Sequence, residues 1–264
     1  MDLDQLLERT ISIAKEAGAF IRKERQSFKV ESIEHKGFND LVSYVDKEAE
    51  KIIVEGLRKI LPEAGFITEE GTDTVQKGVY NWIIDPLDGT TNFIHGLPVY
   101  SVSIALKERD KLLLGVVYEV NLDECFSAIA GKGAFCNGQP IHVSSAANLA
   151  DSLIATGFPY YDFELMSNYL EALRRIMQKS HGVRRLGSAA VDLVYVACGR
   201  VDAFFEYNLN SYDVAAGALI VIEAGGKVTD FDEGNNFLFG RQIIASNSMI
   251  HRELFTELDY FHKI

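Results

Sequence analysis

Two carboxylates end an apolar segment in the first half of the chain. The run Trp82-Ile83-Ile84 leads into Asp85 and Asp88, and Gly89-Thr90-Thr91 follows directly. Charged groups at the rim of a core are costly unless a cation or hydrogen bonds compensate them. Asp85, Asp88 and the intervening Leu87 carbonyl have the oxygen donors that a hard divalent cation prefers, and consecutive N–H groups at a helix start bind anions. The alternative is an ordinary Asp-Gly turn with Thr90 as a helix N-cap.

Other acidic residues could contribute oxygen ligands to the same site, although each has a simpler explanation when taken alone. Glu69 and Glu70 follow the apolar pair Phe66-Ile67, and Asp213 opens the Ala-rich segment DVAAGALIVIEAGG. Taken alone, the glutamates are best explained as a solvated loop and Asp213 as an N-cap. Asp40 and Asp46, in NDLVSYVDKEAE, are caps or helix-surface charges on the same reasoning.

Taken together, these motifs resemble the inositol monophosphatase family of magnesium-dependent, lithium-sensitive phosphomonoesterases. The resemblance rests on Asp46, Glu69-Glu70, the segment DPLDGT and the segment YDVAAG, in this order and at this separation. It extends over nearly the whole chain, through GKGAFCNGQPIHVS, GSAAVDLVYVACGRVDAFFE and EAGG. It implies hydrolysis of inositol monophosphate, or of a similar small polyol phosphate, by metal-activated water.

The resemblance implies a set of oxygen ligands for two or three Mg²⁺ ions. Glu69, Asp85 and the Leu87 carbonyl would hold the first ion. Asp85 would bridge to a second ion, which Asp88 and Asp213 would also hold. A third, weaker ion would bind Glu69 and Glu70 through water. Lithium inhibition follows from the same likeness, with Li⁺ in the place of the second Mg²⁺.

The family pattern also implies catalytic and phosphate-binding groups. Glu69 and Thr90 would orient the attacking water, with Asp46 hydrogen-bonded to Thr90, and the Gly89 and Thr90 amides would hold the phosphate. No Ser, Cys or His nucleophile is required. Lys36, in the polar segment before Asp40, matches a lysine of a mobile loop near the site, and a plain solvated lysine explains it nearly as well.

Substrate recognition would depend on a few hydrogen bonds to hydroxyl groups. Glu206, Asp88 and the Ala189 amide match the inositol contacts of the family, whereas the simpler interpretation of Glu206 is a strand-end surface charge. Thr68 and Tyr212 depart from the usual Gly and Trp. The substrate therefore stays open among inositol monophosphate, fructose 1,6-bisphosphate, a 3′-phosphoadenosine nucleotide and histidinol phosphate. A regulatory binding module without turnover is the non-enzymatic alternative.

A basic cluster near the pocket would favour a substrate with a second phosphate. Arg184 and Arg185 are adjacent in GVRRLG, and strand alternation predicts that they lie on opposite faces. The question of a second phosphate stays open at this level.

The elements that position these residues change character along the chain. Two amphipathic helices are predicted, in residues 1–24 and 44–62, with SIEHKGFND between them as a loop. Short alternating strands follow in residues 80–84, 99–108, 112–120 and 124–130 and indicate an antiparallel meander, with Asn137-Gly138 as a hairpin turn.

After about residue 150, strands alternate with helices. Strands are expected in residues 152–157, 182–187, 201–206 and 242–247, and helices in 166–179, 188–199, 213–226 and 248–261. We therefore predict a layered αβαβα sandwich of mixed α/β (α+β) class. Its N-terminal α+β half, 1–148, carries the metal-ligand motif, and its C-terminal α/β half, 149–264, carries Asp213 and the substrate contacts.

Composition limits the partners of the protein. The 26 Lys and Arg residues against 38 Asp and Glu residues give a net charge of −12, which disfavours nucleic acid and anionic membranes as partners. No apolar run approaches the about 20 residues of a membrane span. Three cysteines without metal-ligand spacing indicate a reduced, cytoplasmic protein. The resemblance and the apolar strands together favour a homodimer that acts on a small phosphate monoester.

Overall fold

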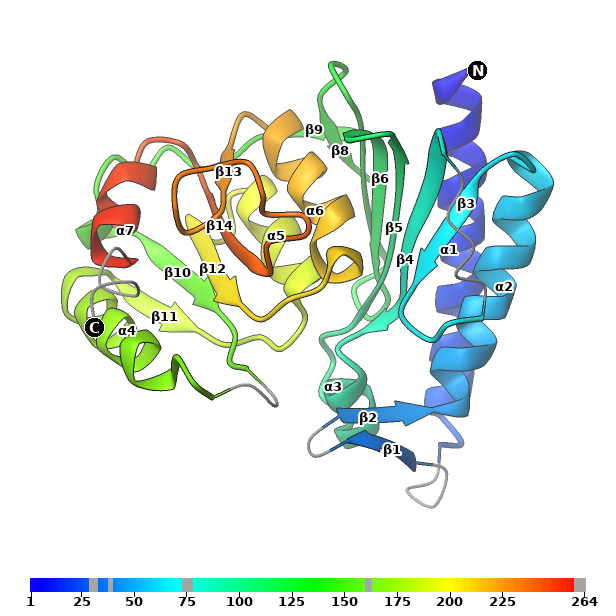
Figure 1. The fold of residues 1–264 in the computed structure, drawn as a ribbon, viewed down its shortest axis with the longest axis horizontal. Helices are drawn as coiled ribbons and strands as arrows, with labels where there is room; N and C mark the ends of the chain where they lie inside the picture. The colour runs from blue at the N-terminus through cyan, green and yellow to red at the C-terminus, as the bar shows by residue number, and fades with distance from the viewer. Residues whose placement is uncertain (29–32, 38–39, 73–77, 160–162, 259–264) are drawn as a thin grey trace.

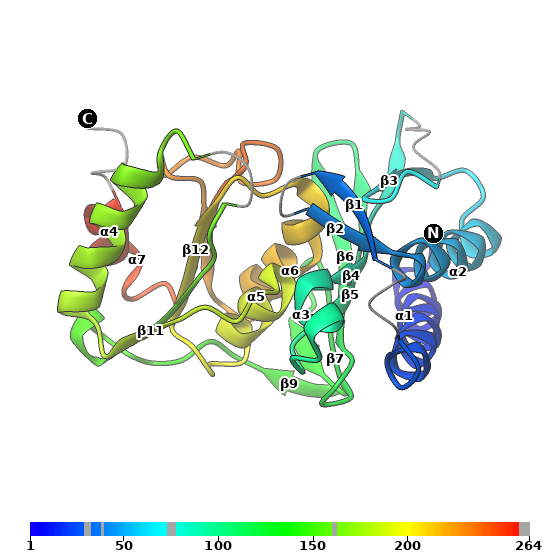
Figure 2. The ribbon, with the colours of Figure 1, turned by 90° about the horizontal axis from the view of Figure 1, so that it is seen from below.

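The fold consists of alternating helical and sheet layers (Figure 1). The structure, a computed structural model, describes residues 1–28, 33–37, 40–72, 78–159 and 163–258, and for 33–37 and 40–42 it describes the backbone alone. Helices α1 (Leu3–Arg25) and α2 (Tyr44–Ile60) form the first layer. A seven-stranded sheet, α5 and α6, a five-stranded sheet, and α4 and α7 follow in that order (Figures 1 and 2). The predicted αβαβα sandwich is confirmed.

The seven-stranded sheet follows the order of the chain from β3 to β9. β3 (Gly65–Thr68) runs parallel to β4 (Tyr80–Asp88), and every later pair is antiparallel, as the meander predicted. The later strands are β5 (Ser101–Glu108), β6 (Lys111–Glu119), β7 (Glu124–Ile129), β8 (Ala134–Cys136) and β9 (Gln139–Ile141). Asn137 and Gly138 form the predicted two-residue turn between the last two, both at positive φ.

The five-stranded sheet has the order β11-β10-β12-β14-β13. Its members are β10 (Leu153–Thr156), β11 (Gly182–Arg184), β12 (Ala203–Tyr207), β13 (Lys227–Thr229) and β14 (Gln242–Ser246). Helices α5 (Ala189–Ala197) and α6 (Ser211–Glu223) cover one face, and α4 (Met166–Lys179) and α7 (His251–Leu258) cover the other (Figure 2). The short 3₁₀ turn Leu149–Asp151 lies where the chain passes between sheets. The division at 148/149 stays a prediction, because α6 of the second half also packs on the first sheet.

The core is divided among the layers, and β4 shows how. Trp82 and Ile84 face the apolar cluster under α1 and α2, whereas Ile83 faces the cluster under α5 and α6. All three side chains are buried, since both faces of the strand are covered. β4 is therefore a rigid support that ends at the carboxylates, and it runs four residues further than the strand predicted at 80–84.

The described residues of the predicted loop SIEHKGFND, 33–37 and 40, belong to two paired β-strands instead. β1 (Ile33–Gly37) and β2 (Asp40–Ser43) pair antiparallel, so Lys36 lies in a strand and Asp40 begins one. Backbone pairing overrides the polar composition that suggested a loop. The side chains of Lys36 and Asp40 lie outside the described part of the structure, and their assignments stay predictions.

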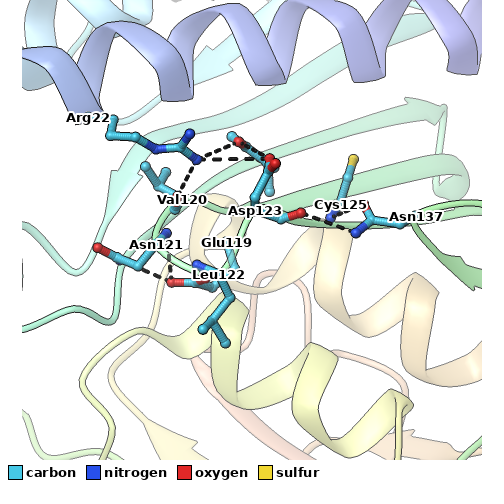
Figure 3. A network of polar contacts seen from close by, with 9 residues as sticks. Arg22, Glu119, Val120, Asn121, Leu122, Asp123, Cys125 and Asn137 are labelled. Atoms are coloured by element: carbon cyan, nitrogen blue, oxygen red, sulfur yellow. Dashed lines mark hydrogen bonds and ion pairs between the residues drawn. The ribbon is translucent and has the colours of Figure 1, made fainter.

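A polar network fixes α1 to the turn between β6 and β7 (Figure 3). Arg22 donates to Val120 O and to the Tyr118 hydroxyl, which in turn donates to Asp123 Oδ1 at 2.6 Å. Glu119 accepts from the amides of the turn, so the left-handed backbone of Asp123 is held on both sides.

Across the described residues, no helix is both long and apolar enough to cross a membrane.

Candidate active site

A cavity of about 280 Å³ opens where the two sheets' loops meet. Nine residues predicted for the site line it: Glu69, Asp85, Leu87, Asp88, Gly89, Thr90, Ala189, Glu206 and Asp213. Asp46 and Glu70 do not line it. The structure thus brings together residues separated by more than half of the chain.

Asp85 and Asp88 lie at an irregularity in β4. Asp85 pairs with Ser103 and Asp88 with Ser101, so one extra residue on β4 forms a bulge between them. Asp85 is 2% exposed, and its Oδ1 accepts the Leu87 amide at 3.0 Å. Burial raises the pKa of Asp85 well above its usual value, and the negative charges of neighbouring carboxylates raise it further, from Glu69, Asp88 and Asp213.

Asp88 connects the two halves of the molecule. Its Oδ2 accepts the Ser188 hydroxyl at 2.6 Å and the Ala190 amide at 2.7 Å, at the start of α5. Burial raises the pKa of Asp88 to about 6 against these hydrogen bonds. The Ala189 amide also lowers the pKa of Asp88, which brings this predicted substrate contact next to the carboxylate.

Asp213 is the third residue of α6 and forms a capping box with Asn210, whose amide donates to Asp213 Oδ2 at 2.6 Å. The N-cap of α6 is Asn210, three residues before Asp213, so the interpretation of Asp213 as the N-cap was wrong. Burial, and next the charge of Asp88, raise the pKa of Asp213 to about 7.

Thr90 begins the short helix α3 (Thr90–His95). Its hydroxyl lies 2.8 Å from Asp46 Oδ1 and 3.0 Å from Leu87 O, two acceptors for one proton. Asp46 is fully buried, and its Oδ2 accepts from the Ser43 amide and hydroxyl. Gly89 precedes the helix at φ +96°, where a side chain would be strained and would meet Val99 O at 2.9 Å.

Glu206, on β12, is buried rather than exposed at a strand end. It is 6% exposed, and a Cβ added at Gly157 would lie 2.0 Å from its carboxyl carbon. Burial raises the pKa of Glu206 well above its usual value, while the charge of Arg185 lowers it.

Sequence patterns assigned neither Gly157 nor Asp192 to the site and left the place of Arg185 open. Gly157 and Arg185 line the cavity, whereas Asp192 does not. β11 ends at Arg184, so strand alternation does not extend to Arg185. Both arginines are exposed. Arg185 lines the cavity, whereas Arg184 donates a hydrogen bond to Val183 O. Asp192 is buried on α5, and its Oδ1 has no hydrogen-bond partner. An acidic residue in an otherwise apolar helix, AAVDLVYVA, was the available signal.

The comparisons with known proteins agree over the whole chain. The model of the inositol monophosphatase family matches residues 2–261. The chain belongs to this family. It is 41% identical to an inositol-1-monophosphatase of Mesorhizobium japonicum, over 94% of both chains. It is 40% identical to the Nus factor SuhB of Escherichia coli K12, over 96% of this chain and 95% of that protein.

Solved structures of the family share the fold. The extragenic suppressor protein SuhB of Bartonella henselae matches with a TM-score of 0.91 at 42% identity, covering 96% of this chain and 98% of that one. The IMPase of Thermotoga maritima matches with a TM-score of 0.89 at 38% identity, covering 98% of both chains.

The carboxylates that line the cavity determine which kind of metal ion it could hold. The carboxylates of the cluster offer only oxygen atoms, and burial raises the pKa values of Asp85, Asp88 and Asp213, with neighbouring carboxylates adding to the rise at Asp85 and Asp213. This fits a hard divalent cation. Within the described ranges, no three acidic, His or Cys groups are already gathered as a metal cluster. The Ser188 hydroxyl and the Asn210 amide orient Asp88 and Asp213, and Asp85 lies within hydrogen-bond reach of both Glu69 and Asp213.

Proposed function

We propose that the protein hydrolyses the phosphate ester of inositol or of a similar small polyol, with Mg²⁺ as cofactor. One observation carries the proposal. Four carboxylates, Glu69, Asp85, Asp88 and Asp213, line a single cavity together with the Thr90 hydroxyl and the first residues of α3. Bound Mg²⁺ supplies Lewis acidity, which lowers the pKa of water and offsets negative charge on phosphate oxygens.

The residues of the chain divide the remaining work. Glu69, Asp85, Asp88, Asp213 and the Leu87 carbonyl would hold the ions, and Glu70 would contribute to a third. When the Thr90 hydroxyl donates its hydrogen bond to Asp46 Oδ1, the lone pairs of the Thr90 oxygen are available to accept a hydrogen bond from the attacking water. The Gly89 and Thr90 amides would bind the phosphate at the helix start.

The hydroxyl-bearing side of the substrate would contact Glu206, Asp88 and the Ala189 amide. Arg185 lies close enough to lower the pKa of both Asp88 and Glu206. Among the described residues that line the cavity, one guanidinium faces several carboxyl groups, which leaves no excess of positive side-chain charge for a second phosphate. This balance favours a monophosphate of a neutral polyol over fructose 1,6-bisphosphate or a 3′-phosphoadenosine nucleotide.

Phosphate release from a panel of substrates tests the proposal. The panel holds inositol 1-phosphate, fructose 1,6-bisphosphate, 3′-phosphoadenosine 5′-phosphate and histidinol phosphate at fixed Mg²⁺. We expect a preference for inositol 1-phosphate that Glu206→Gln reduces, while Glu55→Gln, an exposed change on α2, leaves it intact. A preference for another substrate, with Glu206→Gln indifferent, would refute the recognition scheme.

The relatives named Nus factor SuhB support a second candidate, a regulatory binding role on this fold. A Mg²⁺-dependent rise in melting temperature without release of phosphate from any substrate would favour it. The phosphatase proposal also includes a homodimer, a cytoplasmic location and inhibition by millimolar Li⁺. Light scattering tests the homodimer, and rate measurements with Li⁺ test the inhibition.

A further inference from the structure

Glu50 is an acidic residue, buried beneath α2, that the scheme above does not use. It lies in the first half of α2, and its relative exposure is 0%. A buried carboxylate is retained only where hydrogen bonds or cations compensate its charge. The contacts of Glu50 therefore indicate what it does.

Both carboxylate oxygens of Glu50 accept backbone amides from one loop. Oε2 accepts from Glu70 N and Oε1 from Thr72 N, each at 2.7 Å. The loop leaves β3 directly after Thr68, at the end of the sheet where the cavity opens. Bonds from amides to a charged acceptor are short and strong, so the carboxylate fixes the backbone of this loop.

Glu69 lies between these fixed points. Its own amide donates to Ile84 O at 3.3 Å, which continues the pairing of β3 with β4 up to the cavity. The backbone around Glu69 is thus held by β4 on one side and by Glu50 on the other. Its position relative to Asp85, which follows Ile84, depends on both.

Helix α2 performs the same task twice. Asp46 precedes Glu50 by four residues, which places both on one face of the helix. Asp46 binds Thr90 after β4, and Glu50 binds the loop after β3. Elsewhere the buried face of α2 is apolar, with Ile53, Val54 and Leu57.

We propose that Glu50 is a positioning residue, which sets the loop after β3 so that Glu69 can bind Mg²⁺. The inference rests on the proposed function of Glu69 as a metal ligand. It assigns to Glu50 no contact with substrate or metal. A carboxylate that merely stabilised the fold would change the melting temperature without changing the affinity of the folded protein for Mg²⁺.

Glu50→Gln tests the proposal with almost no change in shape. The amide keeps one acceptor oxygen but turns an NH₂ group towards the second backbone N–H, so one loop bond is lost. Glu48→Gln is the matched control, because Glu48 is an exposed residue of the same helix that pairs with Lys51. Calorimetric titration with Mg²⁺, hydrogen exchange of the loop amides and steady-state rates are compared for the three proteins.

For Glu50→Gln we expect Mg²⁺ affinity to fall about tenfold, the loss that corresponds to one charge-assisted hydrogen bond. The amides of Glu70 and Thr72 should exchange faster without Mg²⁺. At saturating Mg²⁺, KM for inositol 1-phosphate should stay within about twofold of wild type, since the substrate contacts are untouched. Glu48→Gln should match wild type throughout.

Unchanged Mg²⁺ affinity in folded Glu50→Gln would overturn the inference. If the variant does not fold, exchange in the wild-type protein decides: slow exchange at Glu70 and Thr72 without Mg²⁺ supports the inference, and exchange at open-loop rates overturns it. If the wild type releases no phosphate while its Mg²⁺ affinity still depends on Glu50, the substrate proposal fails and the positioning role stands.

Discussion

The Thr90 hydroxyl donates to Asp46 Oδ1 across 2.8 Å, and this bond joins the first residue of α3 to the first turn of α2. Because Asp46 is fully buried and accepts from Ser43 through its other oxygen, its orientation is fixed before any substrate arrives. While the hydroxyl donates to Asp46 rather than to Leu87 O, the direction of the Thr90 lone pairs is fixed with it.

Removal of the Thr90 hydroxyl should therefore reduce turnover more than substrate binding. We expect Thr90→Val to lower kcat by about 10²–10⁴-fold, the range of a lost proton-transfer or orienting group. Thr90→Ser keeps the hydroxyl and should stay within about tenfold of wild type. Rates with inositol 1-phosphate at saturating Mg²⁺ measure both, and equal losses in the two variants would contradict the role of the hydroxyl.

Asp88→Asn should remove the response to metal without unfolding the protein. In the wild type, Mg²⁺ should raise the melting temperature by mass action. In the variant this rise should vanish. Without metal, the variant should melt no lower than wild type, because burial already raises the pKa of Asp88 and makes its charge unfavourable. Thermal denaturation with and without Mg²⁺ measures both effects, with Asp151→Asn, at an exposed turn, as the control.

Gly157→Ala should displace the side chain of Glu206. The added Cβ would lie 2.0 Å from the Glu206 carboxyl carbon, so this side chain must move. We expect kcat/KM for inositol 1-phosphate to fall about tenfold, since misplacement of a recognition group costs orientation. Gly182→Ala, in the same sheet with no contact closer than 3.4 Å, is the control.

A double-mutant cycle shows whether the Gly157→Ala substitution reduces activity through Glu206. If the alanine acts through Glu206, Gly157→Ala should have little further effect in a Glu206→Gln background. Full additivity of the two losses would show that the alanine acts elsewhere.

His251 should make the protein less stable in mild acid. The side chain is 1% exposed, with Nε2 3.1 Å from the Thr229 hydroxyl and Nδ1 2.9 Å from the Ser246 hydroxyl. Burial, and next the charge of Lys227, lower its pKa to about 4. The unfolded chain, with a pKa of about 6.5, binds the proton first, so stability falls as pH drops from about 6.5 to 4. The loss is at most about 3 kcal/mol.

Urea unfolding at pH 7 and pH 5 without Mg²⁺ measures this effect. Asp88 and Asp213 have raised pKa values, so acid changes stability through them in the opposite direction. The decisive quantity is therefore the difference between wild type and His251→Gln, with exposed His181→Gln as the control. An identical pH dependence in all three proteins would refute the prediction.

Local pattern predicted most of the elements. The helix at 166–179 has the predicted bounds, and the antiparallel meander follows the predicted strands closely, since apolar periodicity directly reflects which side chains face a core. The pairing of β1 with β2 was missed because the segment SIEHKGFND is mostly polar, and pairing between backbones is invisible in composition. The Arg184–Arg185 prediction assumed a strand through both residues, whereas β11 stops at the first.

The sequence by itself determined the family and the acidic residues that follow the apolar run of β4, because DPLDGT and YDVAAG keep their identity and order whatever the fold does. Only the tertiary structure decided which groups meet. Packing of the two sheets on either side of α5 and α6 brings Asp213 and Glu206 to Asp88, and burial makes Glu50 the acceptor for a loop 20 residues away. Such contacts join distant segments through backbone atoms, which every residue type shares and no sequence pattern records.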